Sequence, residues 1–169
     1  NQKIMNDAHL HMVFNHFPII GLFFGIGILA YGIIKKQTIL VNTAYVIFIV
    51  CMIMAKATMM TGEGAEEIVE ELGTSHEIIH EHEEIAETFM KILYVLGILS
   101  ILGLVANVKK HAKASIVSYV VLVLAIGAAV ISKSVGTTGG EIRHTEIRAN
   151  ASLGVDTTQS ENEKEGDEN

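Results

Sequence analysis

The sequence contains no tryptophan, one proline and one cysteine among its 169 residues. Because Cys51 has no second cysteine to pair with, the chain can form neither an internal disulfide nor a cluster of thiolate metal ligands. No segment combines basic and aromatic residues in the way that nucleic-acid-binding surfaces do. These absences exclude a disulfide scaffold, a thiolate cluster within this chain and a nucleic-acid partner.

Hydrophobic residues make up half of the chain and concentrate in four stretches that lack Asp, Glu, Lys and Arg. Each stretch contains 17 to 19 residues, close to what an α-helix needs to cross a hydrocarbon core of roughly 30 Å. Four such helices leave too little polar sequence in this short chain to cover them in water. The sequence therefore predicts an all-α, integral membrane four-helix bundle with spans at 17–34, 38–55, 92–108 and 114–132.

Charged residues lie between and after these stretches. The short connections 35–37 (KKQ) and 109–113 (KKHAK) are rich in lysine, which favours the cytoplasmic side of a membrane. Four spans then place both termini outside, together with residues 63–87, which contain ten glutamates and no Lys or Arg. We expect residues 1–150 to form the membrane domain, and the acidic, polar tail 151–169 to be disordered.

The two halves of the chain resemble each other. Each has a polar helix start, a span, a Lys-Lys turn and a second span, followed by KATMMTGE at 56–63 or KSVGTTGGE at 133–141. We therefore expect two repeated helical hairpins, whose polar ends meet at one outer mouth of the bundle.

Residues 76–80 spell HEIIH, which matches the H-E-x-x-H signature of zinc proteases. The metzincin extension is absent, since Glu83 and Ala86 stand where it requires glycine and histidine. No aspartate lies within the four spans to act as the later acidic ligand of an intramembrane metalloprotease. In a segment so rich in His and Glu, the five letters arise easily, and proteolysis is an unfavoured interpretation.

Helical periodicity separates the histidines of this segment. At 100° per residue, His76 and His80 share a face with glutamates, whereas Ile78, Ile85 and Phe89 line the opposite face with His82 on its flank. The apolar face should pack on the bundle, so we expect His82 to point inward and His76 and His80 to remain outside.

Three interpretations of the polar mouth remain open. The first is a b-type haem, whose iron needs imidazoles from different helices. His16 and His82 open the first and third spans and are the expected ligands at similar depth, with His11 as a further candidate. Lys56 and Lys133 occupy matching places in the two halves and could pair with haem propionates, although snorkelling to the interface is the favoured explanation of both.

The second interpretation is a metal site, and the third is an accessory subunit without a cofactor. Glu77-x-x-His80 and Glu141-x-x-His144 match the Glu-x-x-His unit of di-iron carboxylate bundles. Met59 and Met60 would suit a copper ion, and zinc is also open. The candidate metal ligands are His16, His82, Glu63, Glu87, Glu141, His144 and His80. We expect Glu63, Glu87 and Glu141 to accept hydrogen bonds from the second ring nitrogen of the ligand histidines.

Four motifs make the chain similar to the bacterial four-helix membrane proteins classed as domain of unknown function 2231. They are HMVFNHFP at 11–18, Thr-Gly at 61–62, His82 at the opening of the third helix, and GGEI at 139–142. The resemblance covers residues 9–147, and the H-x4-H-F-P element is its most specific part. His144 stands where that family usually carries tyrosine, and the segment 64–84 is longer than usual.

The resemblance implies a redox setting, because relatives occur fused to c-type cytochrome or Rieske iron–sulfur domains. It favours a bacterial inner-membrane subunit that carries electrons through a haem, or exchanges them with quinone, within a respiratory complex. A metal-binding membrane protein is the alternative, and a cofactor-free accessory subunit is the third.

Overall fold

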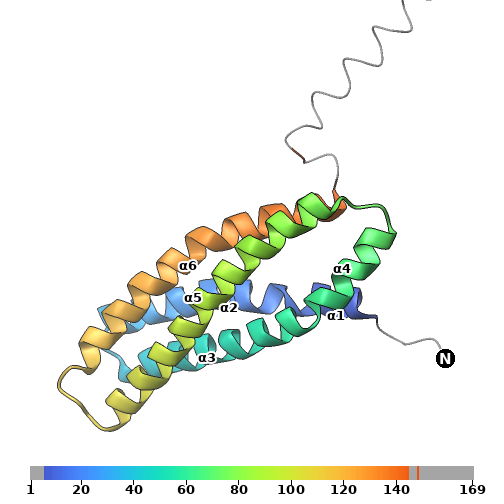
Figure 1. Ribbon diagram of the computed structural model, residues 1–169. Coiled ribbons are helices and arrows are strands. Elements are labelled where there is room, and N and C mark those ends of the chain that lie inside the picture. The colour runs from blue at the N-terminus through green and yellow to red at the C-terminus, as the bar shows by residue number, and fades with distance from the viewer. Residues whose placement is uncertain (1–5, 145–147, 149–169) are drawn as a thin grey trace, which may run out of the picture.

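The structure is a computed structural model that describes residues 6–144 and residue 148 (Figure 1). Within these residues the chain is helical, without strands. The helices are α1 (Asp7–Phe14), α2 (His16–Ile34), α3 (Thr38–Met60), α4 (Gly62–Glu71), α5 (His76–Val108) and α6 (Ala114–Arg143). The predicted tail at 151–169 lies outside the described residues.

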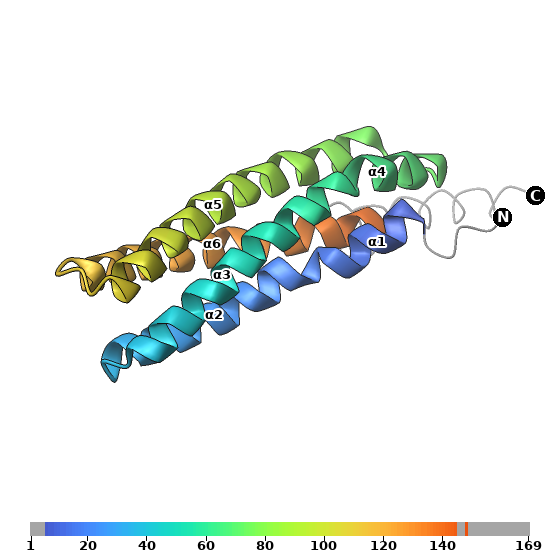
Figure 2. The same cartoon turned by 90° about the horizontal axis from the view of Figure 1, so that it is seen from below.

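The long helices α2, α3, α5 and α6 form a four-helix bundle built from two antiparallel hairpins. Helix α2 packs against α3 and α6, and α5 packs against the same two helices, so the four close into a ring. The turns after α2 and α5 lie at one end of the bundle, and α1 and α4 lie at the other (Figure 2). We call these the loop end and the α4 end. The predicted fold class is therefore confirmed.

Four segments are long and apolar enough to cross a membrane: α1 with α2, then α3, α5 and α6. Helix α5 has 33 residues and is about 50 Å long at 1.5 Å per residue, well beyond a hydrocarbon core of roughly 30 Å. Its exposed large apolar side chains begin at Val95 and continue to Val108. The charge-free stretches are thus the spanning parts, and the first turns of α5 project beyond them.

The bundle core is formed by large side chains that face small ones. Leu22, Leu29, Tyr45, Phe48 and Leu93 are fully buried. Gly25 lies directly against the Phe48 ring, so that a Cβ atom there would collide with it. The missing side chain lets α2 and α3 approach closely, as small residues do in membrane helix pairs.

The break between α1 and α2 falls at Asn15, three residues before Pro18. Proline has no N–H to donate to the carbonyl four residues earlier, which is that of Phe14. The α1 start is capped by Asn6, whose side chain accepts a hydrogen bond from the His9 N–H at 2.9 Å. Helix α1 is thereby set against α4.

Candidate functional site

A cavity of about 530 Å³ opens at the α4 end between α1, α4, α5 and α6. We call it the mouth cavity. Its polar lining includes His9, His11, Asn15, Glu66, His82 and Glu83. Its apolar lining comes from Ile68, Val69, Leu72, Ile79 and Ile142, among others. The volume is within the range of small-molecule and cofactor sites.

His11 reaches the mouth cavity from α1. Its Nδ1 atom lies 3.1 Å from the Thr58 carbonyl oxygen on α3. Because a carbonyl oxygen only accepts, Nδ1 must carry the proton and donate it. The lone pair of the neutral ring is then on Nε2. The ring also lies beside Gly62, where α3 passes into α4.

His82 reaches the same cavity from α5. Its Nδ1 atom lies 2.9 Å from the Thr138 hydroxyl oxygen on α6, and that hydroxyl is 3.0 Å from the Ser134 carbonyl oxygen, to which it donates. The Thr138 oxygen therefore accepts the proton of His82 Nδ1, which again leaves the lone pair on Nε2. Gly139 provides the room, since a Cβ there would lie 3.0 Å from the imidazole Cε1 atom.

The surroundings of His11 and His82 favour the neutral form of both rings. Both residues lie outside the four charge-free stretches. Burial lowers the pKa of His11, against a smaller opposing effect of its hydrogen bond to Thr58. Burial also lowers the pKa of His82, and the nearby His11 lowers it further. Neutral imidazole is the form that binds a metal.

Asn15 adds a polar atom to this cavity. Its Oδ1 is buried and has no hydrogen-bond partner among the described residues. A buried acceptor without a partner costs about 1–3 kcal/mol. Asn15 is one of the residues that line the mouth cavity.

His16 is placed differently from what the sequence predicts. It is exposed, and its Nδ1 lies 2.8 Å from the Met12 carbonyl oxygen. It lines a separate, largely apolar cavity of about 360 Å³ with residues of α2 and α3, including Phe17 and Cys51. The expectation that His16 and His82 face the bundle axis together is therefore wrong. His11 occupies that position, because it lies five residues, or 1.4 turns, before His16 on nearly continuous helix.

The remaining predicted site residues are not part of the lining of the mouth cavity. Lys56, Lys133 and Glu63 are exposed and do not line it. Glu87 is exposed and pairs with Lys91 at 2.8 Å. Glu141 is half-buried and His144 is exposed. The structure shows a carbonyl and a hydroxyl as the acceptors of His11 and His82, so the expected role of Glu63, Glu87 and Glu141 is corrected.

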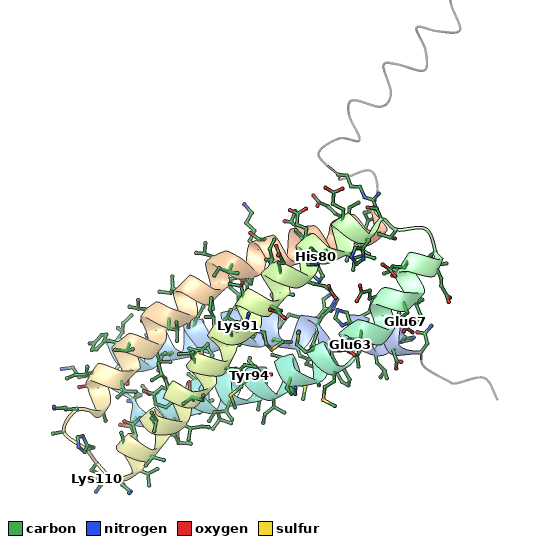
Figure 3. All side chains as sticks on the ribbon, viewed as in Figure 1. Glu63, Glu67, His80, Lys91, Tyr94 and Lys110 are labelled. Atoms are coloured by element: carbon green, nitrogen blue, oxygen red, sulfur yellow. The ribbon has the colours of Figure 1, made fainter. Side chains whose placement is uncertain are left out.

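His76 and His80 lie on the outer face of α5, as the periodicity predicts. Their side chains are 73% and 61% exposed, and their rings stack at 6.1 Å between centroids. The buried neighbour on the inner face is Ile79 rather than Ile78. Figure 3 shows His80, Glu63 and Glu67 toward the α4 end of the bundle and Lys110 at the loop end.

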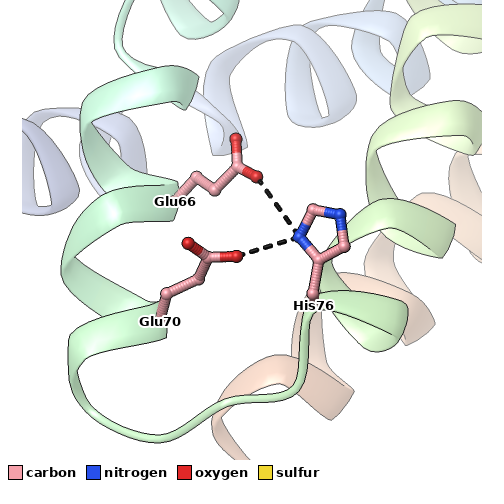
Figure 4. Close-up of side chains that lie close together, drawn as sticks. All are labelled: Glu66, Glu70 and His76. Carbon is pink, nitrogen blue, oxygen red and sulfur yellow. Dashed lines mark hydrogen bonds and ion pairs between the residues drawn. The ribbon is translucent and has the colours of Figure 1, made fainter.

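His76 nevertheless belongs to a second group of possible ligands (Figure 4). Its Nδ1 lies 2.9 Å from Glu70 Oε1 and 4.0 Å from Glu66 Oε1, and the three ligand atoms lie within 4.8 Å of one another. Glu70 is the main cause that raises the pKa of His76, through the hydrogen bond and its charge. Gly73, with φ of 91°, allows the turn from α4 into α5 that brings them together.

Sequence reasoning missed Glu66, Glu70 and Thr138. The glutamates are two of ten similar residues between 63 and 87, and Glu67 and Glu71 have the same i, i+4 spacing, so the sequence pattern does not single them out. Thr138 precedes the Gly139-Gly140 pair, which was the available signal for a close approach at this place. No family model matches the chain, and no curated protein and no solved structure matches it significantly.

Proposed function

We propose that this protein is a membrane redox subunit and that His11 and His82 would hold a b-type haem in the mouth cavity. The observation that carries the proposal is that two histidines from different helices line one cavity and are held in the same tautomer. Each ring donates Nδ1–H to a protein oxygen, which leaves Nε2 as the ligand atom of both. Among the described residues, neither Nε2 has a hydrogen-bond partner.

The lining of the cavity suits a large, mostly apolar group. Ile68 and Val69 of α4 and Leu72, directly after that helix, line one side, and Ile79 and Ile142 lie on α5 and α6. These side chains would exclude water from the ligand nitrogens, and Thr58 and Thr138 would keep the rings oriented. A haem held there would supply one-electron transfer. The partners that we propose are membrane or periplasmic redox subunits of the c-type cytochrome or iron–sulfur class.

The resemblance to the domain of unknown function 2231 supports a redox role, because His11 and His82 both belong to the motifs that carry it. On this proposal the α4 end faces the outside of a bacterial inner membrane, where such redox partners are found. Lys56 and Lys133, which are exposed beside this end, remain candidates for contact with haem propionates.

Divalent-metal binding is the second candidate function, and the group Glu66, Glu70 and His76 favours it. Three ligands at about 2.0–2.1 Å from a tetrahedral Zn²⁺ ion are about 3.3 Å apart. The Nδ1–Oε1 distances of 2.9 and 4.0 Å lie on either side of that value. Mixed imidazole and carboxylate ligands suit Zn²⁺ better than Mg²⁺ or Ca²⁺.

One preparation of the full chain, purified from cells supplied with haem and zinc, tests both functions. We expect a Soret band that is lost in His11→Ala and in His82→Ala and retained in His16→Ala, with circular dichroism showing that all variants are folded. Metal analysis of His76→Ala against His80→Ala tests the second function separately.

Absence of a Soret band from the folded protein would overturn the haem proposal, as would a Soret band that survives both His11→Ala and His82→Ala. Zinc bound at one equivalent and lost only in His76→Ala, without any haem, would establish the second candidate in its place.

A further inference from the structure

The loop end of the bundle carries a positive charge that the chain does not neutralise. Five lysines lie there: Lys35, Lys36, Lys109, Lys110 and Lys113. No aspartate or glutamate occurs in residues 8–62 or 88–140, which include both turns and the parts of the flanking helices that adjoin them. Charges of this kind at a membrane surface attract anionic groups over about one Debye length, or ~8 Å at physiological salt.

A groove between α5 and α6 runs from the lysines of the loop end toward the apolar residues of the two helices. It has a volume of about 320 Å³. Its apolar lining consists of Leu102, Val105, Ala106 and Val117, and its polar lining consists of Lys109, His111 and Lys113. Leu102 and Val105 are exposed and belong to the apolar stretch 92–108. The apolar part of the groove therefore faces the bilayer interior.

A second cavity of about 440 Å³ adjoins the groove through His111, which lines both. Lys36, Thr38, Asn107 and Ser115 contribute hydrogen-bond donors to it. The first turn of α6 borders this cavity at Ser115, and no side chain caps the helix start at Lys113. The positive end of the α6 dipole adds to the attraction for an anion.

His111 is arranged as a donor at the junction of the two cavities. The backbone N–H of Lys113 lies 3.2 Å from His111 Nδ1 and donates to it. Nδ1 of the neutral ring therefore has the lone pair, and Nε2 carries the hydrogen. This is the opposite tautomer from that of His11 and His82, and it suits a phosphate oxygen rather than a metal ion.

We propose that this groove binds an anionic phospholipid, with the phosphate group between Lys109, His111 and Lys113 and an acyl chain along Leu102, Val105 and Val117. A free phosphate would use the basic end alone, and a zwitterionic lipid would use the apolar part without gaining from the charge. Only an anionic lipid matches a basic head-group site that continues into an apolar groove at the height of the bilayer.

The test compares phosphatidylglycerol with phosphatidylcholine of the same acyl chains, added to the full chain in detergent and measured as retained lipid by native mass spectrometry. We expect phosphatidylglycerol to be retained preferentially. The double variant Lys109→Gln/Lys113→Gln should weaken its binding about 30-fold, since each lysine near an anionic surface contributes about 1 kcal/mol. Ala106→Phe, which fills the groove and keeps the charge, should also reduce retention.

The matched control is Lys110→Gln, which removes a neighbouring charge that lines neither cavity and should retain the lipid. Equal retention of the two lipids would overturn the proposal. So would equal loss in Lys110→Gln and in the double variant, or full displacement of the lipid by inorganic phosphate. The haem spectrum should be unchanged in all these variants, which separates this test from that of the mouth cavity.

Discussion

Thr138 determines which nitrogen of His82 is available to a ligand. The threonine is buried on α6, and its hydroxyl donates to the Ser134 carbonyl while it accepts from His82 Nδ1. Thr138 touches no ligand itself and acts through His82, so it is a positioning residue. Hydrogen-bond partners of this kind typically change metal affinity 10–100-fold.

We therefore expect Thr138→Val to weaken haem retention by about 10–100-fold, because the isosteric side chain removes the acceptor without opening a cavity. Thr138→Ser keeps the hydroxyl and should restore both retention and the position of the Soret band. Haem titration of the two variants, with circular dichroism as the folding control, makes the comparison. Equal haem binding by the two variants would contradict the role assigned to Thr138.

At the scale of the elements, close packing of α2 on α3 depends on glycines that face the partner helix. Gly25 lies against the Phe48 ring, whereas Gly27, two residues on, has no atom within 4 Å of its would-be Cβ. The two residues are therefore a matched pair on opposite sides of one helix. Their substitution separates interhelical packing from the intrinsic preference of alanine for a helix.

Gly25→Ala should lower the free energy of unfolding by about 1–3 kcal/mol, because the new methyl group overpacks the contact with Phe48. Gly27→Ala should leave it unchanged or raise it by up to about 1 kcal/mol. Unfolding of the two variants in detergent with increasing denaturant measures the difference. A similar loss in both would show that the α2–α3 contact does not need the glycine.

The periodicity of α5 predicts its inward face well, with one shift. Phe89 is buried, and His76 and His80 are exposed, as expected. Ile79 replaces Ile78 as the buried residue of the first turns, and it lines the mouth cavity together with residues of α1 and α4. Their packing could not be read from the pattern of α5 alone.

The distribution of charge over the whole molecule predicts which end of the bundle faces which side of the membrane. The lysine-rich turns 35–37 and 109–113 lie together at the loop end, and the glutamate-rich α4 lies at the opposite end (Figure 3). Basic short loops favour the cytoplasm. The arrangement thus predicts that α4 and the mouth cavity face outward.

Labelling with a membrane-impermeant thiol reagent tests this orientation. Cys51, the one cysteine of the chain, is buried, so a cysteine placed at exposed Ser75 or Gln37 should report its own side. We expect reaction from outside at Ser75→Cys and none at Gln37→Cys until the membrane is opened. The reverse pattern would contradict an outward mouth cavity.

The four apolar helices, their pairing into hairpins and the outward face of His76 and His80 could be predicted from the sequence alone. These features depend on local hydrophobicity and helical period, which neighbouring residues suffice to define. By contrast, the packing of the helices was needed to show that His11 rather than His16 lines one cavity with His82, and that Glu66 and Glu70 lie close to His76. Those pairings depend on how α1 and α4 pack across the end of the bundle, and on which ring finds an oxygen on another helix at hydrogen-bonding distance.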